Sequence, residues 1–173
     1  MQSNSANIAD FAFLVRRVVH NVNVAPRLSI KTGPAVASVL YRSRALRPFG
    51  ADDLYDLSVQ VAAANRENEI TGYLTYRNVF FTQYFEGSGD DVAELYGRLM
   101  SDTRHEIEVA VVLDVELRRF PDWSMRLIDP LWHPTANAID AIEDLLHTSQ
   151  DSEGASEIVG TLVGLVDQVR QNG

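Results

Sequence analysis

The sequence contains no cysteine among its 173 residues, and this absence excludes several classes of chemistry. Without thiols there is no disulfide framework, no thiolate nucleophile and no cysteine-based metal site. The four histidines are scattered and do not have the spacing of metal ligands. No apolar run is long enough to cross a bilayer, and the polar residues before the first apolar stretch argue against a secretory signal. We therefore expect a cytoplasmic protein with no membrane segment.

Positive charge is also scarce. Fifteen Lys and Arg residues against 24 Asp and Glu residues leave a net charge of −9, which argues against binding to nucleic acid. The sequence shows no carboxylate pair, no nucleophile beside a base and no phosphate-binding glycine loop. The segment GSGDD at 87–91 lacks the lysine of a P-loop. We therefore do not expect an enzyme.

A Gly-Pro pair at 33–34 and the prolines at 130 and 134 divide the chain into three parts. Residues 1–34 form an N-terminal extension, in which Phe11 to Val22 has the pattern of an amphipathic helix. Residues 35–132 form a compact domain. Residues 133–173 form a C-terminal extension with two apolar stripes at helical spacing, which predict two helices.

The compact domain has seven predicted elements. Strands are predicted at 36–43, 69–77, 79–87, 107–117 and 122–128, and helices at 49–68 and 90–105. The order βαββαββ is typical of a ferredoxin-like α+β fold, here with a five-stranded mixed sheet and two helices on one face. A tight turn around Arg77 and Asn78 joins the second and third strands. We expect the C-terminal helices to cover the other face, with a dimer interface as the alternative use of their apolar stripes.

Polar residues interrupt the apolar rows of this domain. Gln83 shares a strand face with Val79, Phe81 and Phe85, and burying an amide without partners costs about 1–3 kcal/mol. Asn65 continues the apolar stripe of the first helix, which otherwise consists of Leu54, Leu57 and Val61. Tyr41 and Ser43 lie on one face of the first strand, and Trp123 and Met125 are expected on one face of the last.

Each of these residues also has a simpler explanation. Asn65 near a helix end can be a cap, Tyr41 can belong to the core, and Gln83 can bond to the backbone. If the three buried faces converge, however, these side chains enter one apolar-walled cavity. Such a cavity suits a flat neutral heterocycle, because an amide matches both carbonyl and ring-nitrogen edges.

Five stretches, taken in order, resemble the BLUF domain, a blue-light sensor that uses FAD. They are VLYRSRA with Tyr41, AAANRENEITG with Asn65, FFTQYFEG with Gln83, SDTRHEIEVAVV, and RRFPDWSMRL with Trp123 and Met125. The resemblance covers roughly residues 35 to 128. Val61 and Ala64 depart from it, since some members carry a small hydroxyl residue and a histidine there.

The resemblance implies that FAD binds between the two helices of the domain, with FMN or riboflavin as alternatives. Asn65 would bond to the carbonyl edge of the ring, and Gln83 would bridge Tyr41 and the N5/O4 edge. Arg104 and His105 would approach the ribose and phosphate side. The remaining expected contacts are Ser43, Leu57, Val61, Leu74, Phe81 and Met125.

The resemblance also implies a photocycle without chemical turnover. Tyr41 would give an electron and a proton to the excited flavin, Gln83 would rotate or tautomerise, and a reversible red-shifted state would follow. Trp123 and Met125 would pass this state to the C-terminal helices. Because the remaining chain is too short for a second catalytic domain, we expect an unknown downstream effector protein or self-assembly into a homo-oligomer. The alternatives are a light-independent ferredoxin-like regulator that binds a small metabolite and, more weakly, an acylphosphatase-type hydrolase.

Overall fold

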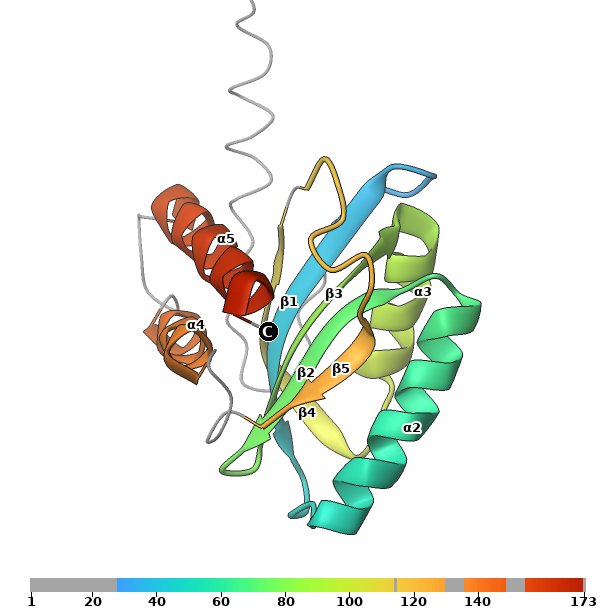
Figure 1. Ribbon diagram of the computed structural model, residues 1–173, viewed down its shortest axis with the longest axis vertical. Coiled ribbons are helices and arrows are strands. Elements are labelled where there is room, and N and C mark those ends of the chain that lie inside the picture. Colours follow the sequence, from blue (N-terminus) through green and yellow to red (C-terminus); the bar gives the residue numbers. More distant parts are fainter. Residues whose placement is uncertain (1–27, 114, 130–135, 149–154, 173) are drawn as a thin grey trace, which may run out of the picture.

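The computed structural model describes residues 28–113, 115–129, 136–148 and 155–172, and these form a sheet between two layers of helices (Figure 1). The elements follow the order β1 (Val36–Ala45), α2 (Ala51–Glu67), β2 (Thr71–Arg77), β3 (Phe80–Ser88), α3 (Gly89–Met100), β4 (His105–Val112), β5 (Ser124–Ile128), α4 (Ala136–Thr148) and α5 (Ala155–Asn172). The strand order is β4-β1-β3-β2-β5, and β5 runs parallel to β2 while the other neighbours are antiparallel. This arrangement confirms the predicted ferredoxin-like fold with a fifth strand.

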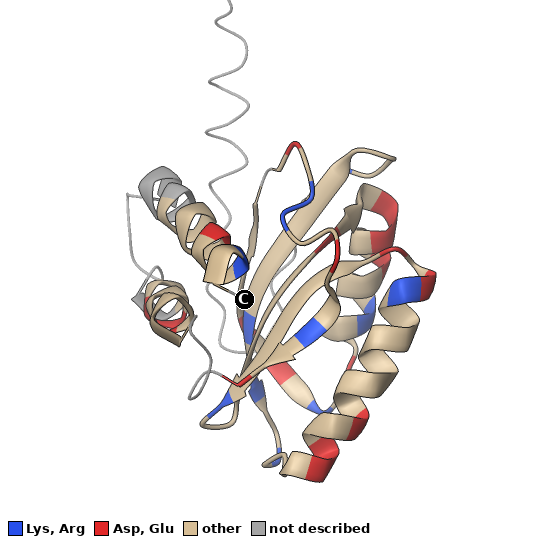
Figure 2. Cartoon of the chain, viewed as in Figure 1, with Lys and Arg blue, Asp and Glu red and all other residues tan. Residues whose placement is uncertain are grey.

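The two helices of the compact domain begin with acidic turns. Asp52 and Asp53 lie in the first turn of α2, and Asp90 and Asp91 in that of α3, as the red segments of Figure 2 show. Negative charge is favourable at this end of a helix, because the unpaired N–H groups there carry partial positive charge. The side chain of Ser88 also caps α3 by accepting a hydrogen bond from the backbone N–H of Asp91 at 3.2 Å.

The largest differences from the predicted element boundaries lie at α3, at β4 and at the hairpin between β2 and β3. Helix α3 ends at Met100 instead of 105, because the Asp102 carboxylate accepts a hydrogen bond from the backbone N–H of Arg104 and closes a turn. Strand β4 therefore begins earlier, at His105, and it ends at Val112. The hairpin loop is Asn78–Val79, where φ is +50° and +66°, so Val79 lies in the turn and not in the strand row.

The sheet has an apolar core on each face. Helices α2 and α3 cover one face, and α4 and α5 cover the other (Figure 1). The core on the face covered by α4 and α5 joins strand residues to the buried stripes of these two helices, which include Ile139, Ile142, Leu146, Leu162, Val166 and Val169. The prediction that the C-terminal helices cover the free face is therefore confirmed. The expected helix from Phe11 to Val22 lies outside the described residues, and the division of the chain at 34 and 132 stays a prediction.

Ionic contacts attach the C-terminal helices to the sheet. Arg77, at the end of β2, contacts Asp140 at 2.6 Å and Glu143 at 2.8 Å, and both carboxylates belong to α4. Thr82 on β3 donates a hydrogen bond to the other oxygen of Glu143 at 3.3 Å. On the second helix, Asp167 pairs with Arg119 of the β4–β5 connection.

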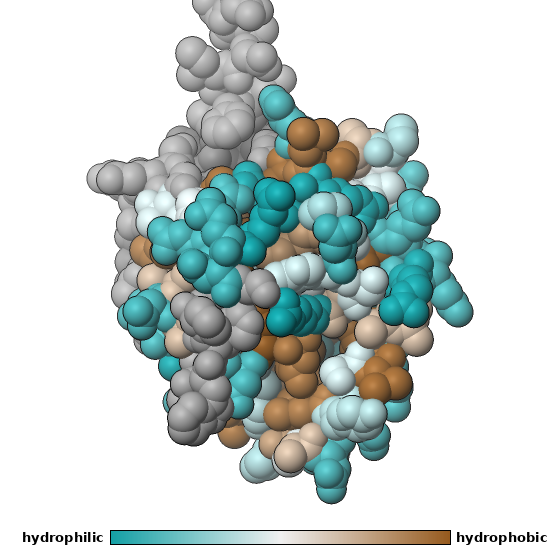
Figure 3. All heavy atoms as spheres, viewed as in Figure 1, coloured by the Kyte–Doolittle hydropathy of each residue, from teal (hydrophilic) through white to brown (hydrophobic). Residues whose placement is uncertain are grey.

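The surface of the described residues is mostly polar. On the face shown in Figure 3, apolar side chains reach the surface in separate patches. The large apolar side chains that are exposed are Leu46, Tyr55, Val59, Met100 and Leu117. Within the described part of the chain, no helix has the length and apolar character needed to cross a membrane.

Candidate functional site

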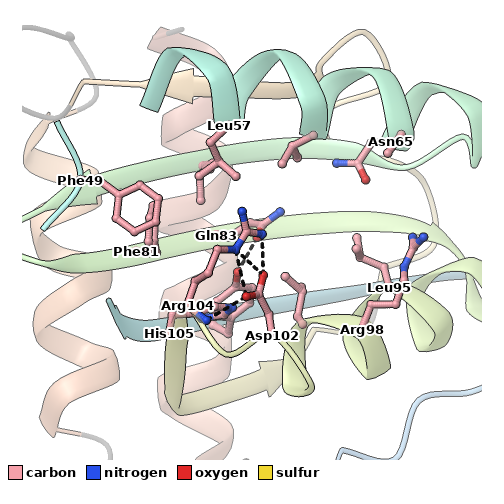
Figure 4. A pocket seen from close by; sticks show the side chains of 15 residues that line it. Phe49, Leu57, Asn65, Phe81, Gln83, Leu95, Arg98, Asp102, Arg104 and His105 are labelled. Atoms are coloured by element: carbon pink, nitrogen blue, oxygen red, sulfur yellow. Dashed lines mark hydrogen bonds and ion pairs between the residues drawn. The ribbon is translucent and has the colours of Figure 1, made fainter. Parts of the chain in front are cut away.

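A cavity of about 200 Å³ lies between α2, α3 and the sheet (Figure 4). Leu57 and Asn65 point into it from α2, while Gln83 and Phe81 approach it from β3. Its walls are largely apolar, and its polar groups come from a few side chains. The lining consists of Tyr41, Phe49, Leu57, Val61, Ala64, Asn65, Leu74, Phe81, Gln83, Leu95, Arg98, Leu99, Asp102, Arg104 and His105. An apolar cleft with a few convergent polar groups is the usual form of a small-molecule site.

Tyr41 and Gln83 form a hydrogen-bonded pair at this cavity. They are direct partners across the antiparallel strands β1 and β3, so their side chains share one face. The Tyr41 hydroxyl donates to Gln83 Oε1 at 2.6 Å, and Gln83 Nε2 donates to Met125 Sδ at 3.1 Å. Gln83 is only 3% exposed. The amide in the apolar row is therefore paired at both ends, by a phenol and a thioether.

Met125 reaches Gln83 because the edge strand bulges at this point. Gly72 pairs with Ser124 and Tyr73 pairs with Arg126, which leaves Met125 as an extra residue, and its φ is +66°. A bulge interrupts the alternation of side chains along a strand.

Trp123 consequently faces away from the cavity. Its ring packs on Phe120, with centroids 4.9 Å apart, in the core beneath α4 and α5, whereas Met125 belongs to the core on the cavity side. The prediction that Trp123 and Met125 share a face was therefore wrong. It relied on a period of two residues, which the bulge breaks.

The side-chain nitrogen of Asn65 is buried without a partner in the described structure. The side chain is 2% exposed, and its Nδ2 donor has no hydrogen-bond partner in the described structure. The alternative that Asn65 caps the helix does not hold, since Asn68 occupies the cap and its Nδ2 donates to Ala64 O at 2.9 Å. His105 Nδ1 is likewise buried and unpaired. Because each unpaired buried group costs about 1–3 kcal/mol, two of them at one cavity suggest a polar-edged ligand.

Two charged residues close one side of the cavity. Arg104 donates to Asp102 through Nε at 3.0 Å and through Nη2 at 2.6 Å (dashed lines in Figure 4). This bond lowers the pKa of Asp102 and raises the pKa of Arg104. Burial raises the pKa of Tyr41, so its phenol is neutral at physiological pH and acts as a hydrogen-bond donor. Burial lowers the pKa of the neighbouring His105 below its ordinary value of 6.5.

Most of the residues predicted as cofactor contacts lie together. Nine of them line the cavity: Tyr41, Leu57, Val61, Asn65, Leu74, Phe81, Gln83, Arg104 and His105. Ser43 is buried on β1, but it is not part of the lining and its hydroxyl has no partner in the described structure. Met125 contributes through its bond to Gln83 and does not line the cavity. That these residues contact a flavin stays a prediction.

Sequence reasoning missed six lining residues, namely Phe49, Ala64, Leu95, Arg98, Leu99 and Asp102. Leu95 and Leu99 lie on the apolar stripe of α3, which the sequence shows. Arg98 is three residues from Leu95, so helical spacing places it near the same face. Asp102 follows the end of the helix at Met100, so helical spacing does not place it. Phe49 precedes α2, and its position depends on the fold of the connection.

Comparisons with known proteins agree with this geometry. The family model for BLUF, described as sensors of blue-light using FAD, matches residues 36–126. The photoactivated adenylate cyclase subunit beta of Euglena longa is 30% identical over 115 residues, which are 65% of this chain and 13% of that protein. This chain therefore spans only a small part of the length of that curated relative.

Solved structures of BLUF proteins also match the fold of this chain. The dark-state structure of BlrB, a BLUF protein, matches with a TM-score of 0.56 and 28% identity, covering 76% of this chain and 97% of that chain. A structure of BlrP1 from Klebsiella pneumoniae with FMN and cyclic diGMP matches with a TM-score of 0.52 and 25% identity, covering 76% of this chain and 34% of that one.

Proposed function

This chain belongs to the BLUF family of blue-light sensors that use FAD, and from this premise we propose that Tyr41, Gln83 and a flavin in the cavity form its photoactive centre. The cavity offers apolar walls for a flat ring. Asn65 and His105 supply unpaired polar atoms, and an amide can meet both the donor and the acceptor atoms of a ring edge. FAD is the proposed cofactor, with FMN or riboflavin as alternatives.

Different lining residues would contact different parts of this ring. Asn65 would bond to its carbonyl edge, and Gln83 would face the edge nearest Tyr41. The apolar wall would come from both helices and the sheet, through Leu57, Val61, Leu74, Phe81, Leu95 and Leu99. Arg98 and Arg104 would lie toward the polar chain of the cofactor. Of these two, Arg104 is already engaged by Asp102.

The single observation that carries the mechanism is the hydrogen-bonded series from Tyr41 through Gln83 to Met125. A flavin bound in the cavity would supply a strong one-electron oxidant when it absorbs blue light. Tyr41 would then lose one electron and would pass its phenolic proton along the existing bond to Gln83 Oε1. An amide can exchange donor for acceptor by rotating, so Gln83 would turn while Tyr41 is oxidised. The electron and the proton would return to Tyr41, and the amide would keep its new orientation until it relaxes in the dark.

The reoriented amide would also change the contact with Met125. Rotation moves Nε2 away from Met125 Sδ, and Met125 occupies a left-handed backbone conformation that costs about 1–3 kcal/mol for a residue other than glycine. We propose that β5 responds to this change and passes it to α4 and α5. The output would be a changed interaction with a downstream protein or between copies of the chain, without chemical turnover.

The purified protein provides the test. We expect a yellow protein whose flavin can be released and identified by chromatography, and whose absorption bands shift to longer wavelength under blue light and return in darkness. A colourless protein with a normal circular dichroism spectrum would contradict the proposal. It would favour the light-independent binder of a small metabolite.

A further inference from the structure

His105 lies against the ring of the proposed electron donor. The imidazole of His105 and the phenol ring of Tyr41 are stacked, with centroids 6.2 Å apart and an interplanar angle of 28°. Phe81 approaches the same imidazole edge-on, with ring centroids 6.3 Å apart and an interplanar angle of 75°. The strand register fixes this arrangement, because His105 pairs with Ala45 at the end of β1.

We infer that His105 sets the pH range of the light response, because Tyr41 can give up its electron and proton only while the His105 imidazole is neutral. This inference rests on the proposed function of Tyr41. It gives the charge of His105 an effect on the oxidation of Tyr41, in addition to any contact between His105 and the cofactor.

Hydrogen bonding excludes His105 as the group that accepts the proton from Tyr41. The Tyr41 hydroxyl already donates to Gln83 Oε1 at 2.6 Å. His105 Nδ1 is buried and has no partner in the described structure, so the imidazole can gain a proton there without breaking a bond to the protein. Protonation would therefore add a positive charge beside the Tyr41 ring and leave the bond to Gln83 in place.

That charge would oppose the first step. Removing an electron would leave a positive charge on the hydrogen-bonded pair of Tyr41 and Gln83, and a second positive charge on an imidazole whose centroid lies 6.2 Å from the phenol ring, in a buried site, would raise the cost. The step is balanced without His105, because Tyr41 would give its proton to Gln83 Oε1 and its electron to the oxidant that a bound flavin would supply, and both would return to Tyr41. His105 keeps one protonation state throughout, which the pH sets before illumination.

The surroundings of His105 hold it neutral near pH 7. Burial lowers the pKa of His105, Arg104 lowers it further, and Asp102 acts in the opposite direction. From β1 and β3 the imidazole meets Tyr41 and Phe81, of which only Tyr41 titrates, far above neutral pH. On α3, Arg98 lines the same cavity and Tyr96 acts on Tyr41. We therefore expect the light response to be intact at neutral pH and to be lost in acid.

The test measures the yield of the red-shifted state per absorbed photon between about pH 8 and about pH 5, the range in which histidine titrates. In the wild-type protein the yield should fall by about tenfold or more below the pKa of His105, as a single nearby charge would produce. In His105→Gln and His105→Phe, the second of which retains a ring, the yield relative to the same variant's own value at about pH 8, measured at equal flavin loading, should not depend on pH. Asp102→Asn removes the group that favours the charged imidazole, so the midpoint should move to lower pH.

A second readout does not depend on photochemistry. NMR titration of labelled histidine in the flavin-loaded protein, kept in the dark, should give a pKa for His105 below 6.5 that equals the midpoint of the yield. A wild-type yield that stays constant with pH, a midpoint that differs from this pKa, or the same acid loss in His105→Gln would overturn the inference. Absence of a red-shifted product at every pH would instead overturn the proposed function, and the inference with it.

Discussion

The phenol of Tyr41 donates a 2.6 Å hydrogen bond to the side-chain oxygen of Gln83, its direct partner across strands β1 and β3. Both side chains are almost fully buried, at 2% and 3% exposure. The bond leaves the nitrogen of the same amide for Met125. A rotation of Gln83 would thus exchange its partners on both sides, which gives the site two distinct hydrogen-bonded states.

Replacing Tyr41 tests the donor assignment. Tyr41→Phe should bind flavin but give no red-shifted state, because the phenol that supplies the electron and proton is gone. It should also lose about 1–3 kcal/mol of unfolding free energy, since Gln83 Oε1 is left buried without its donor. Light-minus-dark absorbance and urea unfolding measure the two effects.

Tyr73→Phe is the matched control. The hydroxyl of Tyr73 is buried on the opposite face of the sheet and has no partner in the described structure. Its removal should leave both the photocycle and the stability unchanged or slightly improved. A normal photocycle in Tyr41→Phe, or its loss in Tyr73→Phe, would show that the donor has been assigned to the wrong residue.

Asn65 should lower the stability of the flavin-free protein and raise its affinity for flavin. Asn65→Leu removes an unpaired buried amide, so the flavin-free protein should be at least as stable as the wild type. Flavin affinity should fall by about 10- to 100-fold, the loss of one or two hydrogen bonds to the ring. Fluorescence quenching of added riboflavin measures this affinity. Asn68→Ala removes only a helix-end bond to Ala64 O and should keep it. Equal affinity in Asn65→Leu and the wild type would exclude Asn65 from the binding site.

Gly72 should tolerate no side chain. Its φ is +146°, and a Cβ there would lie 2.1 Å from the carbonyl oxygen of Tyr84. Gly72→Ala should therefore cost more than about 3 kcal/mol of unfolding free energy. Gly97→Ala is the control, because a Cβ at this position of α3 meets nothing within 4 Å, and it should stabilise by about 0.5–1 kcal/mol. Denaturant unfolding of both variants checks the contrast, and similar stabilities would contradict the close approach at Gly72.

Glu143 should hold α4 on the sheet. Its carboxylate accepts hydrogen bonds from Arg77 and Thr82 and is largely buried, so Glu143→Gln should cost about 1–3 kcal/mol. Amide exchange in α4 should be faster in this variant. Glu94→Gln breaks only an exposed contact to Arg98 and should change stability by less than about 0.5 kcal/mol. Unchanged exchange in α4 of Glu143→Gln would show that the apolar contacts alone hold this helix.

The order of elements and the meeting of Tyr41, Gln83 and Asn65 at one cavity were predictable from periodicity, whereas the other predicted contacts were implied by the resemblance to the BLUF domain. Alternation placed Tyr41 and Gln83 on one face, and the helical stripe placed Asn65 beside them. The presence of three polar residues in apolar rows was the signal that located the cavity. The covering of the free sheet face by α4 and α5 followed from apolar stripes that needed a partner.

The errors occur where local geometry overrides periodicity. The bulge at Met125 places Trp123 on the opposite face of the sheet. A methionine in the sequence does not predict the positive φ that Met125 adopts there. The turn closed by Asp102 ended α3 early and brought Arg104 and His105 to the cavity. Ser43 follows the expected alternation but lies beyond the lining. Such features depend on contacts between distant segments, which the pattern of a single segment does not contain.

The most direct test of the account is the light-minus-dark absorption spectrum of Gln83→Leu, recorded beside the wild type at equal flavin loading. Leucine has a similar size but cannot accept the bond from Tyr41 or exchange donor for acceptor. The account predicts that the variant binds flavin and shows no reversible red shift under blue light. A red shift of normal size and recovery in Gln83→Leu would contradict it.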